Sequence, residues 1–537
     1  MKRLTSILLL ILTVATAAQA VPAWRQWHQA VLADGTAVEV TLCGDEWYHW
    51  MEDACGRRYQ ESADGCLAPL SSEEHQAGMA RRASRIAKEY RCHPLRQPRR
   101  SLYQGQRKGL IILVQFPDLP MQDTDAQAVW ERYANGNLDD LGHQGSIHDY
   151  FLDQSNGLFD LTFDVAGPVT MEQEAAYYGE NDSYGQDFRS PIMLEEACRA
   201  IADTTDFRRY DWDNDGEVEQ VFLLYAGRGE NTSRKPSLIW PHKYSITGWQ
   251  EDGYIEYNVL RINGVIIDSY ACSCELSYYN QLDGIGTICH EFSHCLGLPD
   301  LYDTDTGRSV LGEWDLMDQG EYNQGGWSPP NYSAYERAVC GWLQLKELSA
   351  PTTVTALLPL GDGGMAYRIT NDCWEQGKEE YYIVENRQKT GWDSSLPEAG
   401  LLITHIDYDE TLWEDNRPNA NRSHLCVSYI SPLAYNMRRG VTYPYQQLDS
   451  LTDVSQPAAQ LYNMNLHGAY LMGKPLTGMT VSDDGLASFD FMGGASSAVF
   501  LAPVTRPVSP DKLYDLLGRR GAARSVKVKD KRIFLSY

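Results

Sequence analysis

The chain has 537 residues, enough for three or four domains of ordinary size. Its hydrophobic content of 43% can bury a sizeable core, which excludes a wholly disordered protein. With 46 basic and 73 acidic residues the formal net charge is −27, and so acidic a protein lacks the basic face that nucleic acid requires. We therefore expect a multidomain protein with no nucleic-acid partner.

The first 20 residues have the pattern of a secretory signal peptide. Lys2 and Arg3 precede an almost wholly apolar run, and a small-residue cleavage site ends at Ala20. A membrane anchor is the alternative, but the apolar run is shorter than the roughly 20 residues that a spanning helix needs. No later stretch could span a bilayer, so the sequence predicts a protein that is secreted or held at the cell surface. Export would permit disulfides among the 12 cysteines, although their spacing does not give the pairing.

Residues 21–105 are predicted to form a propeptide. Short strands with turn signals over 21–70 precede a helical pattern over 71–91. Between Arg81 and Lys108 the charge becomes strongly basic, and prolines interrupt any helix. We expect an extended, exposed connector here, at which proteolysis would release the propeptide. A solvated basic surface is the alternative interpretation.

Strands mixed with helices over 106–345 predict a catalytic domain of the α+β class. The apolar run at 109–116 is typical of a buried strand, and a helix is expected over about 283–297. Short β runs and turn residues dominate 346–495, which predicts a β-rich second domain. Residues 496–537 would be a linker and a tail.

The strongest chemical signal is the run His290-Glu291-x-x-His294. On a helix, residues four apart face the same way, so both imidazoles can reach one zinc ion. Glu291 would lie beside the metal and act as the catalytic base that takes a proton from water. Gly297 can end the helix, and the chain can then turn back and bring Asp300 to the metal as a third ligand.

Asp300 completes the spacing of the metzincin peptidases, in which histidine more often holds this position. A carboxylate oxygen is an acceptable zinc ligand, and three protein ligands leave a fourth position open for water. Asp303 and Asp305 are rival third ligands. Met317, within the turn-like run 312–320, would form the methionine turn beneath the metal. A buried helix with incidental histidines is the alternative to the whole assignment.

A second acidic cluster surrounds a glycine turn. Asp211, Asp213, Asp215 and Glu219 place oxygens at the spacing that suits calcium. The twelfth position of this run is phenylalanine rather than glutamate, so it is not a complete helix-loop-helix calcium loop. We expect structural Ca²⁺ here, with an acidic surface turn as the alternative.

These motifs resemble those of the immune inhibitor A family of secreted metallopeptidases (metallopeptidase family six). The resemblance covers about residues 109–490, and its clearest segments are 149–157, 290–303, 312–320, 333–343, 380–393 and 396–407. It implies a Zn²⁺-dependent, metzincin-like endopeptidase that acts on proteins or peptides and is made as a zymogen with a signal peptide and a propeptide. Ser293 stands where the family usually has glycine.

Several residues have less specific predicted roles. Tyr302 and Tyr322 could bind the oxyanion that forms during hydrolysis. A Cys92 thiolate could block the open zinc position, or the residue could instead form a disulfide with another early cysteine. Four polar residues that match family motifs in the β region are expected to give packing and polar support: Glu385, Arg387, His405 and Asp407.

The C-terminal runs 513–520 and 532–537 resemble the sorting tails of proteins exported by the type IX route, which would make export machinery a partner. A β-hairpin that closes the second domain is the alternative. Two further functions compete with a peptidase: a secreted adhesion or binding protein with an inactive peptidase-like core, and a zinc amidohydrolase for non-peptide amides. The complete set of metal and base residues argues against the first, and only the family resemblance argues against the second.

Overall fold

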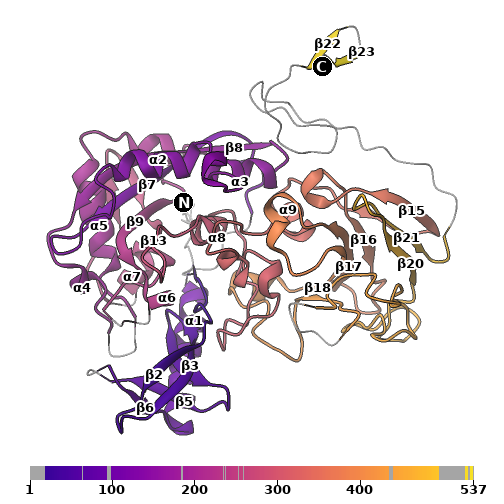
Figure 1. Ribbon diagram of the computed structural model, residues 1–537, viewed down its shortest axis with the longest axis horizontal. Coiled ribbons are helices and arrows are strands. Elements are labelled where there is room, and N and C mark those ends of the chain that lie inside the picture. Colours follow the sequence, from indigo (N-terminus) through magenta and orange to yellow (C-terminus); the bar gives the residue numbers. More distant parts are fainter. Residues whose placement is uncertain are drawn as a thin grey trace, which may run out of the picture.

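The computed structural model describes residues 19–494 and the pairs of strands at 526–529 and 532–535, apart from short gaps at 63–64, 93–97, 183–185, 234, 236, 252, 258 and 434–438. The described part mixes helices and strands, as the α+β prediction requires. In Figure 1 the N-terminal sheet lies at the bottom, the large mixed sheet with its helices lies on the left, and the later β sheets lie on the right. The predicted signal residues 1–18 lie outside the described part.

The N-terminal sheet is an antiparallel meander with the strand order β2-β3-β4-β5-β6. Its strands are β2 (His28–Val31), β3 (Ala37–Asp45), β4 (Tyr48–Asp53), β5 (Arg58–Glu61) and β6 (Leu67–Pro69). Helix α1 (Ser72–Cys92) follows and packs on this sheet. A Cβ atom at Gly78 would collide with the ring of Tyr48, so this glycine, which is unfavourable for helix propensity, permits the close approach.

The predicted extended connector is wrong over its first part. Helix α1 continues to Cys92, and Arg82 is buried, with its Nε 3.0 Å from Asp45 Oδ1 on β3. At the other end of the connector, the Arg100 guanidinium donates to the Val339 carbonyl at 2.8 Å, and the next strand already begins at Gly105. A basic run has the same composition whether its charges are solvated or paired in the interior, which is why composition misled here.

The central sheet has the order β1-β10-β13-β9-β7-β8. Its strands are β1 (Gln19–Ala20), β10 (His242–Ser245), β13 (Ser269–Leu276), β9 (Val221–Arg228), β7 (Gly105–Gln115) and β8 (Phe159–Thr170). The last four in this order are parallel, whereas β10 runs antiparallel to β13 and β1 runs antiparallel to β10. The second half of β7, from Gly109 to Val114, and most of β9 are continuous buried runs, as expected where helices cover both faces of a sheet.

Helices lie around this sheet: α2 (Ala126–Asn135), α3 (Ile147–Gln154), α4 (Ala175–Tyr178), α5 (Ser190–Ile201), α6 (Glu230–Ser233), α7 (Ile246–Glu251) and α8 (Gly286–Cys295). Helix α9 (Ala334–Val339) lies beside the later β sheets (Figure 1). A small hairpin joins β11 (Leu260–Ile262) to β12 (Val265–Ile267). Helix α8 lies near the centre of the molecule in Figure 1. Phe292 on α8 packs against Phe151 of α3 and Phe163 of β8, which fixes the helix against the sheet.

The later region contains a five-stranded sheet, β14-β16-β17-β18-β19, and a three-stranded sheet, β15-β21-β20. The strands are β14 (Lys346–Glu347), β15 (Thr352–Leu357), β16 (Tyr367–Thr370), β17 (Glu379–Arg387), β18 (Gly400–Tyr408), β19 (Val427–Tyr429), β20 (Leu476–Val481) and β21 (Ala487–Phe491), with helix α10 (Glu410–Glu414) after β18. Alternate residues of β17 belong to different cores: Ile383 packs in the core of the central sheet, whereas Val384 packs in the core of the β-rich region. The two regions therefore share one packed interface.

Near the C-terminus, β22 (Val526–Lys529) pairs with β23 (Arg532–Leu535). Neither strand joins another sheet of the described chain. The rest of the predicted linker and tail, including 513–520, lies outside the described residues. Among the helices that the structure describes, none combines the length and apolarity that crossing a bilayer would demand.

Candidate metal centre

Helix α8 and the turn after it gather three donor residues. His290 and His294 lie on one face of the helix, and the chain reverses at Gly297, whose φ of +82° is in the left-handed region that glycine adopts without strain. Asp300 returns to the histidines. The three side chains are buried, and one ligand atom from each lies within 4.8 Å of the others.

The distances between these donors fit a zinc ion. Asp300 Oδ1 lies 3.2 Å from His290 Nε2 and 3.5 Å from His294 Nε2. Ligand atoms about 2.0–2.2 Å from zinc at tetrahedral angles are about 3.3–3.6 Å apart. None of the three atoms has a hydrogen-bond partner, although an unsatisfied polar atom is costly in a protein interior. The donor set therefore fits a metal ion such as zinc that is held by three protein ligands.

Backbone carbonyls hold both rings in the orientation that metal binding needs. His290 Nδ1 lies 2.8 Å from the Leu316 carbonyl, and His294 Nδ1 lies 2.7 Å from the Leu298 carbonyl. When Nδ1 carries the proton and donates it, the lone pair is on Nε2, which faces the site. Burial lowers the pKa of His294 to about 4. Burial opposes ionisation of Asp300, but the nearby histidines outweigh it and lower its pKa to about 2. A neutral imidazole and an ionised carboxylate are the forms that bind metal.

Glu291 lies beside this donor set on the same helix. It is completely buried, and neither carboxylate oxygen has a hydrogen-bond partner of good geometry. Burial raises the pKa of Glu291 well above its usual value, while His290 and the nearby Val21 N–H act in the opposite direction. A carboxyl group with a raised pKa in a dry site is suited to accepting and returning a proton.

The rival third ligands lie elsewhere. Asp305 forms an ion pair with Arg417 at 2.8 Å, and Asp303 accepts a hydrogen bond from the Thr306 hydroxyl at 2.5 Å. Among the residues that the structure describes, only Asp300 forms a metal-competent group with the two histidines.

Met317, the predicted methionine of a turn beneath the metal, lies in a turn that contacts the donor residues through its backbone. It is fully buried, and its carbonyl accepts a hydrogen bond from the Leu301 N–H at 2.8 Å, one residue after Asp300. The preceding carbonyl, of Leu316, is the one that holds His290. This turn therefore contacts both the helix and the returning loop.

The residues around the predicted cleavage site lie beside Glu291. Strand β1 pairs with the edge strand β10 in antiparallel register. Val21 is completely buried, its N–H is close to Glu291, and its carbonyl accepts a hydrogen bond from Trp240 Nε1 at 3.1 Å. The Pro22 carbonyl accepts a hydrogen bond from the Tyr322 hydroxyl at 2.8 Å. An extended peptide thus passes the candidate base, with the peptide bond before Val21 beside it.

The end of β3 and the turn that follows it also lie against the loop after Asp300. A Cβ atom at Gly307 would lie 2.5 Å from Gly44 Cα, so the loop after Asp300 and this turn are in backbone contact. Burial raises the pKa of Glu46 in this turn well above its usual value, and the charge of Asp300 adds to the rise. Burial likewise raises the pKa of Tyr302, next to Asp300.

The second acidic cluster is brought together only in part. Asp211, Asp213 and Asp215 have carboxylate oxygens within 4.8 Å of one another, but Glu219 does not join them. One Glu219 oxygen accepts a hydrogen bond from a backbone N–H at 2.6 Å, and the other lies 3.1 Å from the Arg99 guanidinium. Arg99 also contacts Asp213 at 2.5 Å. A cation from the connector therefore already lies at the edge of this loop.

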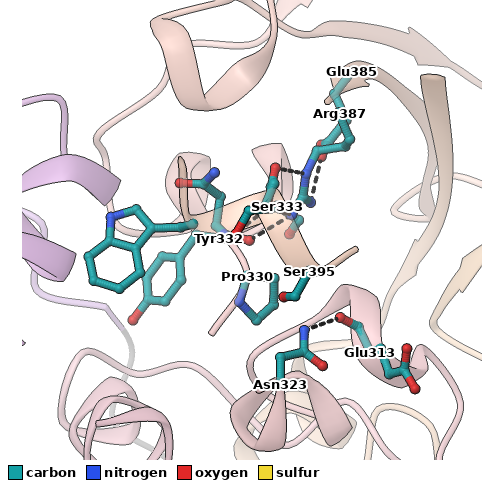
Figure 2. Close-up of polar contacts among 12 residues, drawn as sticks. Glu313, Asn323, Pro330, Tyr332, Ser333, Glu385, Arg387 and Ser395 are labelled. Atoms are coloured by element: carbon teal, nitrogen blue, oxygen red, sulfur yellow. Dashed lines mark hydrogen bonds and ion pairs between the residues drawn. The ribbon is translucent and has the colours of Figure 1, made fainter. Parts of the chain in front are cut away.

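Two of the predicted support residues join the β-rich region to the central one. Figure 2 shows Glu385 and Arg387 beside the segment that contains Ser333. The Ala334 N–H donates to Glu385 Oε2 at 2.7 Å, and Arg387 donates to the Asn331 carbonyl at 3.0 Å. Both side chains are completely buried, so these contacts are structural links between the two regions.

The other two support residues bind within the β-rich region. His405 Nε2 lies 2.8 Å from Glu380 Oε1, and Asp407 contacts His424 at 2.6 Å. The side chain of Cys92 lies outside the described residues. Among the cysteines whose side chains the structure describes, the buried ones are free thiols: Cys43, Cys198, Cys272, Cys274, Cys289, Cys340 and Cys426.

Two contributions to this site could not be recognised from the sequence. One is the peptide at Val21, which no motif marks. The other is Asn416, whose side chain donates to Asp300 Oδ2 at 2.6 Å from a loop 116 residues further along the chain. A contact across that separation has no periodicity or spacing from which it could be recognised.

Comparison with known proteins identifies the central region. Residues 100–346 match the family model described as "Immune inhibitor A peptidase M6, catalytic domain". The chain is 25% identical over 291 residues to the "Pre-pro-metalloprotease PrtV" of Vibrio cholerae, which covers 45% of this chain and 31% of that protein. It is 23% identical over 287 residues to "Immune inhibitor A" of Bacillus thuringiensis, covering 45% of this chain and 41% of that protein. The chain thus spans less than half the length of either relative, and the predicted resemblance is confirmed for the central region.

Proposed function

We propose that this chain, which contains an immune inhibitor A-type catalytic domain over residues 100–346, is a secreted zinc endopeptidase that hydrolyses proteins and is made as a zymogen. The observation that carries the proposal is the set of three unsatisfied, buried donor atoms beside Glu291 on one helix. The His-Glu-x-x-His run, the returning Asp300 and the turn at Met317 support a metzincin-like arrangement of the site.

The residues of the site would have different roles in hydrolysis: three would hold the metal, and Glu291 would transfer the proton. A zinc ion held by His290, His294 and Asp300 would act as a Lewis acid on the attacking water and on the peptide carbonyl. The Glu291 carboxylate accepts a proton from that water and passes it to the nitrogen of the leaving amine. Its burial without hydrogen-bond partners keeps both oxygens available for this transfer.

A peptide is a better substrate for this site than a small amide. Strand β10 is short and lies next to β1 at the edge of the central sheet, where an extended chain can add by backbone hydrogen bonds. Trp240 and Tyr322 then donate to two successive carbonyls, as they do to those of Val21 and Pro22. These contacts recognise backbone, which favours polypeptides of varied sequence.

The same contacts support latency. Cleavage after Ala20 would remove β1, but Val21 and Pro22 would still lie against Glu291, Trp240 and Tyr322, where a substrate would have to bind. We infer that the region 21–105 is an inhibitory propeptide and that cutting in the connector activates the enzyme. Tyr322 then has a role in binding peptide carbonyls rather than the oxyanion, and Tyr302 remains a candidate for the oxyanion.

The remaining assignments concern the surroundings of the enzyme. We propose secretion or cell-surface display with cleavage after Ala20, and export through the C-terminal tail. Structural calcium at Asp211, Asp213 and Asp215 is supported by the proximity of their oxygens, with Glu219 joining only if Arg99 leaves.

The direct test is the variant Glu291→Gln. It should bind one zinc per chain, measured by elemental mass spectrometry, yet lose activity on casein by a factor of about 10²–10⁴, because the ligands remain but the base is gone. Two matched variants test the ligands: Asp300→Asn should lose zinc, and Asp303→Asn should retain it. Normal turnover by Glu291→Gln, or equal zinc content in both aspartate variants, would refute the assignment.

A further inference from the structure

Asp300 is held by a loop that lies outside the matched catalytic segment. Helix α10 ends at Glu414, and the following loop turns toward the metal centre. Asn416 in this loop is 1% exposed. Its Oδ1 accepts a hydrogen bond from the Asp300 backbone N–H at 2.6 Å, and its Nδ2 donates to Asp300 Oδ2 at 2.6 Å.

This pair of hydrogen bonds leaves one carboxylate oxygen free. Asp300 Oδ2 is engaged by Asn416, whereas Oδ1 faces the two histidines and has no hydrogen-bond partner. A carboxylate so restrained presents a single oxygen in a fixed direction. Such outer contacts orient metal ligands and usually matter for affinity.

The loop also contacts residues that follow Asp300 in the chain. The Thr304 hydroxyl donates to the Asn416 carbonyl at 3.1 Å, Arg417 pairs with Asp305 at 2.8 Å, and Asn419 Nδ2 donates to the Leu301 carbonyl at 2.7 Å. These contacts could fix the position of the loop without Asn416. They also supply controls, because they do not touch the carboxylate of Asp300.

We propose that Asn416 is a positioning residue for the metal ligand Asp300, so that the functional metal centre includes the loop 415–419 from the β-rich region. The proposal rests on the function proposed above, in which Asp300 is a zinc ligand. It also implies that the segment 100–346 alone is an incomplete zinc site.

A backbone role for Asn416 must be separated from this one. Its φ is +50°, in the left-handed region, and asparagine is favoured there directly after a helix. Glycine satisfies that conformation at least as well. Asn416→Gly therefore keeps the turn and removes both side-chain hydrogen bonds to Asp300. Asn416→Asp, nearly identical in shape, keeps the acceptor and replaces the donor by an oxygen that faces Asp300 Oδ2.

The experiment measures the zinc dissociation constant of the full chain by competition with a chromophoric chelator, in a Glu291→Gln background that prevents self-cleavage. Loss of an outer contact typically costs about 10–100-fold in metal affinity. We expect losses of that size for Asn416→Gly and Asn416→Asp, and less than about twofold for the loop controls Arg417→Ala and Asn419→Ala. Melting curves in excess chelator compare the stabilities of the metal-free variants.

Each outcome decides the question. A zinc affinity within about twofold of the parent for both Asn416 variants would overturn the proposal, as would an equal loss in the Arg417 or Asn419 controls, which would indicate only general docking of the loop. If Asn416→Gly does not fold, Asn416→Asp alone decides in the same way. Absence of zinc from the parent chain would instead refute the proposed function.

Discussion

The buried pair of Arg82 and Asp45 should control how tightly the N-terminal region covers the active site. Both side chains are essentially unexposed, at 0% and 1%. Replacing Arg82 by methionine leaves the Asp45 carboxylate buried with only two backbone N–H donors, those of Trp47 and Tyr48. Removing one partner of a buried ion pair costs about 3–5 kcal/mol. If that free energy is lost from the covered state alone, the ratio of covered to uncovered molecules falls about 150- to 5,000-fold.

The assay is the initial rate of peptide hydrolysis by the uncut chain, read before any cleaved product appears on a gel. Arg82→Met should raise this rate and make helix α1 more sensitive to limited proteolysis. The double variant Arg82→Met with Asp45→Leu removes both charges and should recover most of the latency, because an apolar pair of similar volume avoids the unpaired charge. The control is Arg57→Ala, which removes a mostly exposed guanidinium from Asp53, while Asp53 keeps its hydrogen bonds from the Cys55 N–H and the Tyr59 hydroxyl, so the loss should be at most about 1 kcal/mol. An Arg82→Met protein that behaves like the Arg57 control, or a double variant no better than the single one, would refute the reasoning.

Calcium should raise the melting temperature of the wild type, because a bound cation relieves the repulsion of crowded carboxylates, and Asp213→Asn with Asp215→Asn should remove most of the shift at constant zinc content. Equal calcium-induced shifts of the melting temperature in the two proteins would show that this cluster is only an acidic surface turn. Binding of the cut propeptide should weaken as pH rises. Burial opposes protonation of His49, but the carboxylate of Glu230, 3.2 Å away, outweighs burial and raises the pKa of His49. The stabilisation of the bound propeptide by protonated His49 is therefore complete below about pH 6.5 and is lost as the pH rises through the raised pKa. Burial also raises the pKa of nearby Asp187, so the contribution of this group to binding is likewise lost as the pH rises. Gel filtration of the cut complex between about pH 5 and about pH 9 tests this, with His49→Gln as control, and dissociation that does not vary with pH would contradict it.

Local patterns predicted the elements that carry the chemistry. The spacing of His290 and His294 indicates a shared helix face, and Gly297 indicates the turn that returns Asp300, because each depends only on a few neighbouring residues. The same holds for β7, β9 and β17, whose apolar or β-branched runs are sufficient to indicate strands.

What could not be predicted depends on contacts between distant segments. Arg82 has the sequence context of a solvated basic helix, and only the position of Asp45 in the folded sheet makes it a buried residue. The pairing of β1 with β10 joins residues more than two hundred positions apart, and Asn416 reaches Asp300 from another sheet region. Side-chain type alone cannot indicate such partners, because asparagine in a turn is equally expected for backbone reasons.

The contacts of Val21 and Pro22 with Trp240 and Tyr322 also determine how activation can work. Because the covering peptide is part of the same chain, its local concentration at the site is set by the tether and does not depend on the concentration of the protein. A protein substrate at far lower concentration competes poorly, even if its backbone makes the same hydrogen bonds to Trp240 and Tyr322. One cut in the connector changes none of these contacts, yet it lowers the concentration of the covering peptide to that of the protein itself. Dilution after secretion would then complete activation, so the strength of latency depends on chain connectivity as much as on the affinity of the contacts.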